Sequence, residues 1–88
     1  MTTLVRPLMT NLLDDLAWSI HDYLLEESTV FNGGRLVLIP ITAIVRKFDR
    51  NHRTIARRLH ALKEEGLLVP IIKKDYTTLY WVKDQDED

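Results

Sequence analysis

The side chains best suited to binding a charged ligand are concentrated between residues 46 and 58. This segment holds six basic residues and one acid, namely Arg46, Lys47, Arg50, Arg53, Arg57 and Arg58 with Asp49. Lysine and arginine bind phosphate oxygens, and one arginine can also donate two hydrogen bonds to a guanine edge. The segment is therefore a candidate site for a polyanion, and duplex DNA is the polyanion that we expect.

The distribution of charge favours the same ligand, although the net charge of the chain is only −1. Residues 1–34 carry one Arg against five Asp and Glu, a balance of −4. Residues 35–83 hold eleven Lys and Arg against four Asp and Glu, a balance of +7, and residues 84–88 return −4. A basic block between acidic ends is expected when one face of a protein meets a polyanion. We interpret residues 84–88 as a disordered acidic tail, with folding back onto the basic face as the alternative.

Other chemistries find little support in the sequence. The absence of cysteine excludes disulfides, thiolate zinc sites and thiol nucleophiles. The three histidines form neither an i, i+4 pair nor a cluster with carboxylates, apart from the single pair His60 and Glu64. No nucleophile motif or phosphate-binding glycine loop occurs. We therefore expect a binding protein and not an enzyme, with no cofactor and no metal ion.

The length and hydropathy of the chain predict one domain. A chain of 88 residues can bury one core, so we assign residues 1–83 to a single domain that begins with an extended arm at residues 1–9. No apolar run approaches the roughly 20 residues of a membrane helix, and the first residues do not resemble a signal peptide. We therefore expect a cytoplasmic protein with no membrane partner.

The first half of the chain predicts one helix and one short strand. The periodicity predicts a helix from Asn11 to about Glu27, with Thr10 or Asn11 as its N-cap. The Asn32-Gly33-Gly34 sequence is a strong turn signal. It precedes a short strand, predicted at residues 35–39.

Two further helices are predicted around the basic segment. Ile41, Ile44, Val45 and Phe48 recur at helical spacing and predict a helix of about two turns. Asn51 is a good N-cap for the next helix, which we place at residues 51–65 and end at Gly66. Its apolar positions lie on one face, so Arg53 and Arg57 fall on the opposite, solvent-exposed face.

The last part of the chain predicts a β-hairpin. Two apolar, β-branched runs flank a polar connection at Asp75-Tyr76. Because Pro70 cannot donate a backbone hydrogen bond, we expect it on the outer side of an edge strand or at a bulge.

The segment ITAIVRKFDRNHRTIARRLHALKEEGLLVP resembles the winged helix-turn-helix regulators of the MarR and ArsR type. Thr54-Ile55 match the Thr-Val pair of that pattern, Leu59 and Leu62 its two leucines, and residues 66–68 its Gly-Leu-Val turn. The resemblance covers residues 40–83 and differs in the turn between the helices, where Asp49-Arg50 replace the usual small residue. Residues 1–34 match no family pattern.

The resemblance implies an α+β winged helix-turn-helix fold with three helices, a short strand and a C-terminal hairpin wing. It also implies sequence-specific binding of double-stranded DNA, with helix 51–65 in the major groove and the wing at residues 73–77 on the backbone or in the minor groove. The expected base contacts are Arg53, Thr54 and Arg57. The expected backbone contacts are Arg46, Lys47, Arg50, Asn51, His52, Arg58, Lys73 and Lys74. Transcription regulation is implied by the resemblance alone.

Alternatives remain for several of these residues. A solvated helix face would also explain the charges, and Arg58 is equally well placed to pair with an acid of the first helix. Trp18 and Leu25 fall roughly 200° from the apolar stripe that includes Leu16, which predicts a contact patch for a homodimer. A winged-helix adaptor that binds another protein through this patch is the second function that we consider.

Overall fold

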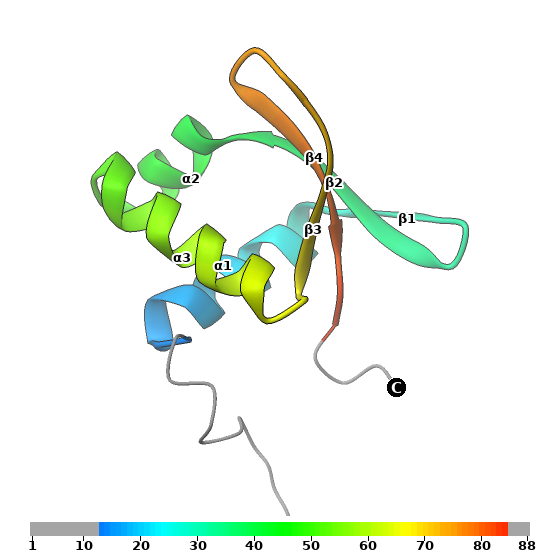
Figure 1. Ribbon diagram of the computed structural model, residues 1–88, viewed down its shortest axis with the longest axis horizontal. Coiled ribbons are helices and arrows are strands. Elements are labelled where there is room, and N and C mark those ends of the chain that lie inside the picture. Colours follow the sequence, from blue (N-terminus) through cyan, green and yellow to red (C-terminus); the bar gives the residue numbers. More distant parts are fainter. Residues whose placement is uncertain (1–12, 85–88) are drawn as a thin grey trace, which may run out of the picture.

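The computed structural model describes residues 13–84, which form an α+β domain of three helices and one four-stranded antiparallel sheet (Figure 1). In chain order the elements are α1 (Asp15–Glu27), β1 (Thr29–Phe31), β2 (Gly34–Pro40), α2 (Ile41–Phe48), α3 (His52–Glu64), β3 (Leu68–Lys74) and β4 (Thr77–Val82). The strands lie in the order β1-β2-β4-β3. The predicted arm at residues 1–9 lies outside the described residues, as do residues 85–88 of the predicted acidic tail.

Helix α1 begins later than the sequence predicted. The helix starts at Asp15, and its N-cap is Asp14, whose Oδ1 accepts a hydrogen bond of 2.9 Å from the backbone N–H of Ala17. The prediction of a start at Asn11 was therefore wrong. An aspartate at the N-cap satisfies one of the backbone donors that the first helical turn leaves without a partner.

The strand predicted at residues 35–39 is longer than expected and has an additional neighbour. Strand β2 spans seven residues and pairs with β1 through a tight turn at Asn32 and Gly33. Their φ angles are 51° and 81°, the left-handed values that a two-residue hairpin turn requires. The turn signal was thus correct, but the three-residue strand before it was not predicted.

Helices α2 and α3 have nearly the predicted limits. Asn51 caps α3, with its Oδ1 accepting a hydrogen bond of 2.8 Å from the N–H of Thr54. Helix α2 ends at Asp49, which adopts the left-handed conformation with φ 53° and ψ 48°. Aspartate tolerates this conformation better than most residues, so Asp49 makes the turn in which the resemblance led us to expect a small residue.

The C-terminal hairpin is also as predicted. Strand β3 lies at the edge of the sheet and pairs with β4, and their register shifts between Pro70 and Ile72. The prediction for Pro70 is confirmed, because it lies in an edge strand next to an irregularity. Asp75 has a φ of 59° in the turn between the strands.

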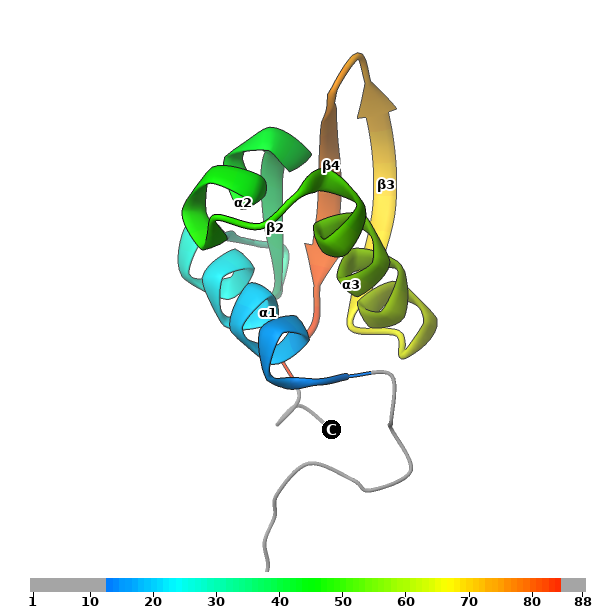
Figure 2. The ribbon, with the colours of Figure 1, turned by 90° about the vertical axis from the view of Figure 1, so that its left-hand side faces the viewer.

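The helices cover one face of the sheet and form the core with it. Figure 2 shows α1, α2 and α3 in front of the sheet, with the β3–β4 hairpin projecting beyond them. The buried side chains on the sheet side are Val37, Ile39, Leu68 and Val82, and those on the helix side include Ile20, Leu24, Ile44, Ile55, Leu59 and Leu62. The alternation along β2 and β4 and the helical spacing in α3 therefore meet in one core.

Trp18 belongs to this core, which corrects the sequence prediction. The residue is only 5% exposed, and its ring packs edge-on against His21. Leu25 is partly buried and packs against the core as well. Because α1 contacts α3, β2 and β4, a wider arc of the helix is buried than the stripe through Leu16 predicted. The patch that we expected Trp18 and Leu25 to form is not on the surface.

His21 is fully buried and links α1 to the end of the sheet. Its Nε2 lies 2.5 Å from the backbone oxygen of Lys83, so Nε2–H is the donor to that carbonyl. His21 is therefore a structural residue. No helix within residues 13–84 has the length and apolar character to cross a membrane.

Candidate nucleic-acid interface

The exposed face of α3 carries the residues predicted to contact DNA bases. Arg53 and Arg57 are both exposed and lie one helical turn apart, while Thr54 between them is partly buried. The cap at Asn51 fixes the start of the helix and thereby the direction of these side chains. With 13 residues, α3 is about 20 Å long. A helix of this size fits a DNA major groove, which is about 12 Å wide.

Arg58, a predicted phosphate contact, is held by an ion pair inside the protein. Its Nη2 lies 2.7 Å from Oδ2 of Asp14, and its Nε donates to the same carboxylate at 3.1 Å. This hydrogen bond is the main reason why the pKa of Asp14 lies below its ordinary value of 3.8, and partial burial opposes the shift. The contact supports the alternative that we left open for Arg58, namely a pair with an acid next to the first helix.

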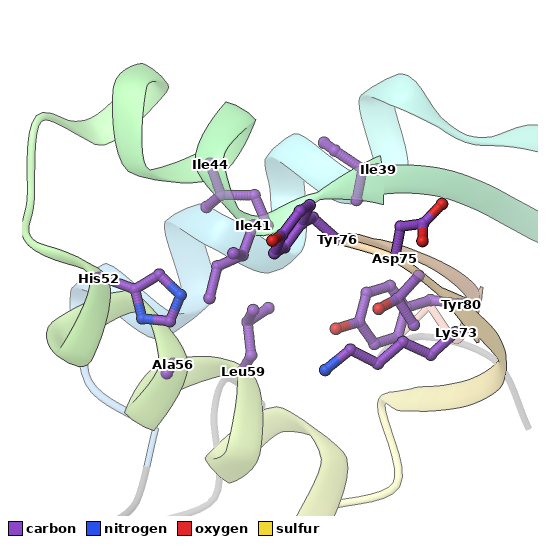
Figure 3. Close-up of a pocket in the computed structure, with 11 residues that line it drawn as sticks. Ile39, Ile41, Ile44, His52, Ala56, Leu59, Lys73, Asp75, Tyr76 and Tyr80 are labelled. Atoms are coloured by element: carbon purple, nitrogen blue, oxygen red, sulfur yellow. The ribbon is translucent and has the colours of Figure 1, made fainter.

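A groove separates the N-terminal half of α3 from the β3–β4 hairpin (Figure 3). Its volume is about 420 Å³. The floor is apolar and consists of Ile39, Ile41, Ile44, Ala56 and Leu59, and the polar rim consists of His52, Lys73, Asp75, Tyr76, Thr78 and Tyr80. We call it the α3–hairpin groove.

Cationic and hydroxyl groups from both walls face this groove. Lys73 and Tyr80 reach from the hairpin toward α3, and His52 stands at the start of α3 on the opposite wall (Figure 3). Burial raises the pKa of the Tyr80 phenol, and a hydrogen bond with Thr78 acts in the opposite direction. Tyr80 is therefore a neutral hydrogen-bonding group at physiological pH.

The two hairpin lysines lie on different faces of the sheet. Lys73 pairs in register with Thr78, on the face that the helices cover, and Lys74 pairs with Thr77 on the other face. Lys73 accordingly lines the α3–hairpin groove, while Lys74 lies in a shallow depression beside Leu38 and Ile72. Of the two predicted phosphate contacts, only Lys73 shares a side with α3.

The remaining predicted backbone contacts are in α2 and the turn that follows it. Arg46, Lys47 and Arg50 are exposed. The Nζ of Lys47 lies 5.5 Å from the ring centroid of Tyr23 in α1, a cation–π distance. Lys47 is thus drawn toward α1, whereas Arg50 lies directly before the cap of α3.

Sequence reasoning missed three residues of the groove. Tyr76 at the hairpin turn is 82% exposed, and Thr78 and Tyr80 line the wall below it. The alternation in residues 77–82 was a usable signal, because every second residue of a strand faces the same side. Which side that is depends on the pairing of β4 with β2.

Among residues 13–84, no three His, Cys, Asp or Glu side chains are grouped as a metal site would require. His60 and Glu64 lie 3.8 Å apart on the exposed side of α3. Searches against protein-family models, curated proteins and solved structures found no match to this chain. The case for its function therefore rests on its own residues and geometry.

Proposed function

We propose that this protein is a winged-helix protein that binds double-stranded DNA in a sequence-specific manner and regulates transcription. One observation carries the proposal, which is that exposed cations of α3 and a cation of the β3–β4 hairpin flank the same groove. In this arrangement α3 enters the major groove and the hairpin, acting as a wing, meets the adjacent backbone or minor groove. The regulatory role follows from the resemblance of residues 40–83 to MarR- and ArsR-type regulators.

Each wall of the α3–hairpin groove has a separate role in this proposal. Arg53, Thr54 and Arg57 read base edges, and each good bidentate contact contributes about 1 to 3 kcal/mol of discrimination. Lys73, Arg50 and His52 hold the backbone, which fixes the register of the helix but carries no sequence information. Arg46, Lys47 and the amide of Asn51 are further backbone contacts.

Titration of duplex DNA with the wild type and with an Arg53→Ala/Arg57→Ala variant tests the proposal. For the wild type, the logarithm of the binding constant should fall linearly with the logarithm of the salt concentration. The variant should bind all duplexes at least tenfold more weakly and lose its preference among sequences. The slope should decrease only where an arginine also contacts phosphate, by about 0.9 per phosphate lost.

An Arg35→Ala/Lys83→Ala variant is a matched control, since it also removes two cations. Both residues are exposed and lie at the end of the sheet away from the hairpin turn. The control should keep the sequence preference of the wild type. Absence of binding at about 50 mM salt, or an equal loss in both variants, would contradict the proposal.

The second function considered above, a protein-binding adaptor, has lost the observation on which it rested. Its contact patch was to be Trp18 and Leu25, and Trp18 is buried in the core. DNA binding therefore stands as the only function that we propose here.

A further inference from the structure

The sheet has a second face, on the side away from the helices, and this face is apolar. The strand register places six large apolar side chains on it, namely Leu36 and Leu38 of β2, Val69 and Ile72 of β3, and Leu79 and Trp81 of β4. We call this set the outer sheet face. Their neighbours in sequence, such as Val37 and Val82, point to the helices and form the core.

The outer sheet face is exposed to solvent in the single chain. Leu38, Ile72 and Val69 are 68%, 59% and 43% exposed, and none of the six belongs to the core or packs against it. A large apolar side chain carries about 150 to 250 Å² of surface, so these three alone expose roughly 300 Å². With Leu36, Leu79, Trp81 and the adjoining Phe31, the patch exceeds what a typical monomer leaves uncovered.

The residue pattern is that of strands covered on both faces. A half-solvated antiparallel strand alternates apolar and polar residues, whereas a strand that is buried on both sides is apolar throughout. Strand β2 reads GRLVLIP and β4 reads TTLYWV, so the central strands lack a polar face over most of their length. The only charged side chain that the register places on the outer side within the four strands is Lys74, at the hairpin end.

We propose that the outer sheet face binds a second copy of this chain, so that two sheets pack back to back in a homodimer. An isologous two-fold contact needs a surface that is complementary to itself, and a continuous apolar face with its one charge at the end meets this requirement. Two aligned sheets pack about 10 Å apart with interdigitating apolar side chains. The six residues with Phe31 and the intervening backbone approach the roughly 800 Å² per partner of a standard interface.

The dimer surface is separate from the proposed DNA surface. Arg53 and Arg57 lie on α3, which packs on the opposite face of the sheet. The proposal therefore does not depend on DNA binding, and its test needs no DNA.

Sedimentation equilibrium of the full chain from micromolar to millimolar concentration tests the proposal. The wild type should show twice the chain mass of 10.3 kDa. A Leu38→Glu variant places a carboxylate in the centre of the face, twice per dimer, and should weaken dimerisation at least a hundredfold. Because Leu38 is largely exposed in the single chain, this variant should keep the circular dichroism spectrum of the wild type. Ile72→Glu should act in the same way.

Val30→Glu is the matched control, because Val30 is 64% exposed and its register places it on the other side of the sheet. This variant should remain a dimer. A wild type that stays monomeric throughout would overturn the proposal and would mean that another segment or another protein covers the face. A Leu38→Glu variant that remains as dimeric as the wild type would also overturn it, since the dimer would then use a different surface.

Discussion

Substitutions at Asp14 should separate the two contacts that its carboxylate makes. The side chain caps α1 through Ala17 and pairs with Arg58 of α3, 44 residues further along the chain. Asp14→Asn keeps an oxygen that can accept the Ala17 hydrogen bond and removes the charge that pairs with Arg58. Asp14→Ala removes both contacts.

The expected losses follow from the exposure of the pair. The Arg58 and Asp14 side chains are 28% and 48% exposed, so solvent screens their attraction. An exposed pair contributes about 0.5 to 1 kcal/mol, which is the loss that we expect for Asp14→Asn. Loss of an N-cap costs about 1 kcal/mol more. Since 1 kcal/mol shifts the melting temperature of a domain of this size by about 4 to 8 °C, the two variants should be distinguishable.

The same pair predicts how stability depends on pH. The hydrogen bond from Arg58 lowers the pKa of Asp14 in the folded protein below its ordinary value of 3.8. The charged carboxylate therefore stabilises the fold at and above physiological pH, and this contribution is lost as the pH falls through the lowered pKa. The stability difference between the wild type and Asp14→Asn should thus be constant near neutral pH and disappear in strong acid.

Urea unfolding of the wild type, Asp14→Asn, Arg58→Ala and the double variant measures the coupling directly. At neutral pH and low salt the cycle should give a coupling free energy of about 0.5 to 1 kcal/mol. Arg58→Ala should also weaken DNA binding less than Arg57→Ala, because Arg58 is held inside the protein. A coupling of zero would refute the reasoning about the pair.

Two further predictions concern positions where the backbone or a close contact restricts the residue. A Cβ added at Gly34 would overlap the ring of Trp81, so Gly34→Ala should lower the free energy of unfolding by about 1 to 3 kcal/mol. Replacing Trp81 by Leu in that background should recover part of the loss, and an unaffected melting temperature would contradict the contact. Asp49 occupies the left-handed region with a φ of 53°, where glycine has no steric penalty. Asp49→Gly should therefore raise the free energy of unfolding by about 0.5 to 1 kcal/mol, and Asp49→Val should lower it in the same urea titrations.

Much of the local structure could be predicted because its signals are local. The cap at Asn51, the helical spacing in α2 and α3, the turn at Asn32 and the irregularity beside Pro70 each depend on residues within a few positions. The charges on the exposed face of α3 could be predicted for the same reason. A helix places Arg53 opposite Ile55 and Leu59 in any tertiary context.

The tertiary structure determined the features that depend on distant residues. Helix α1 begins where Asp14 can cap it and also meet Arg58, and Trp18 is buried because three other elements pack around that helix. Strand pairing placed Lys73 beside α3 and Lys74 on the opposite side, and a shift of one residue would exchange them. The sequence by itself determined which residues can bind DNA, since residue type and helical period are local properties. Which of them share one surface depended on contacts between segments far apart in the chain.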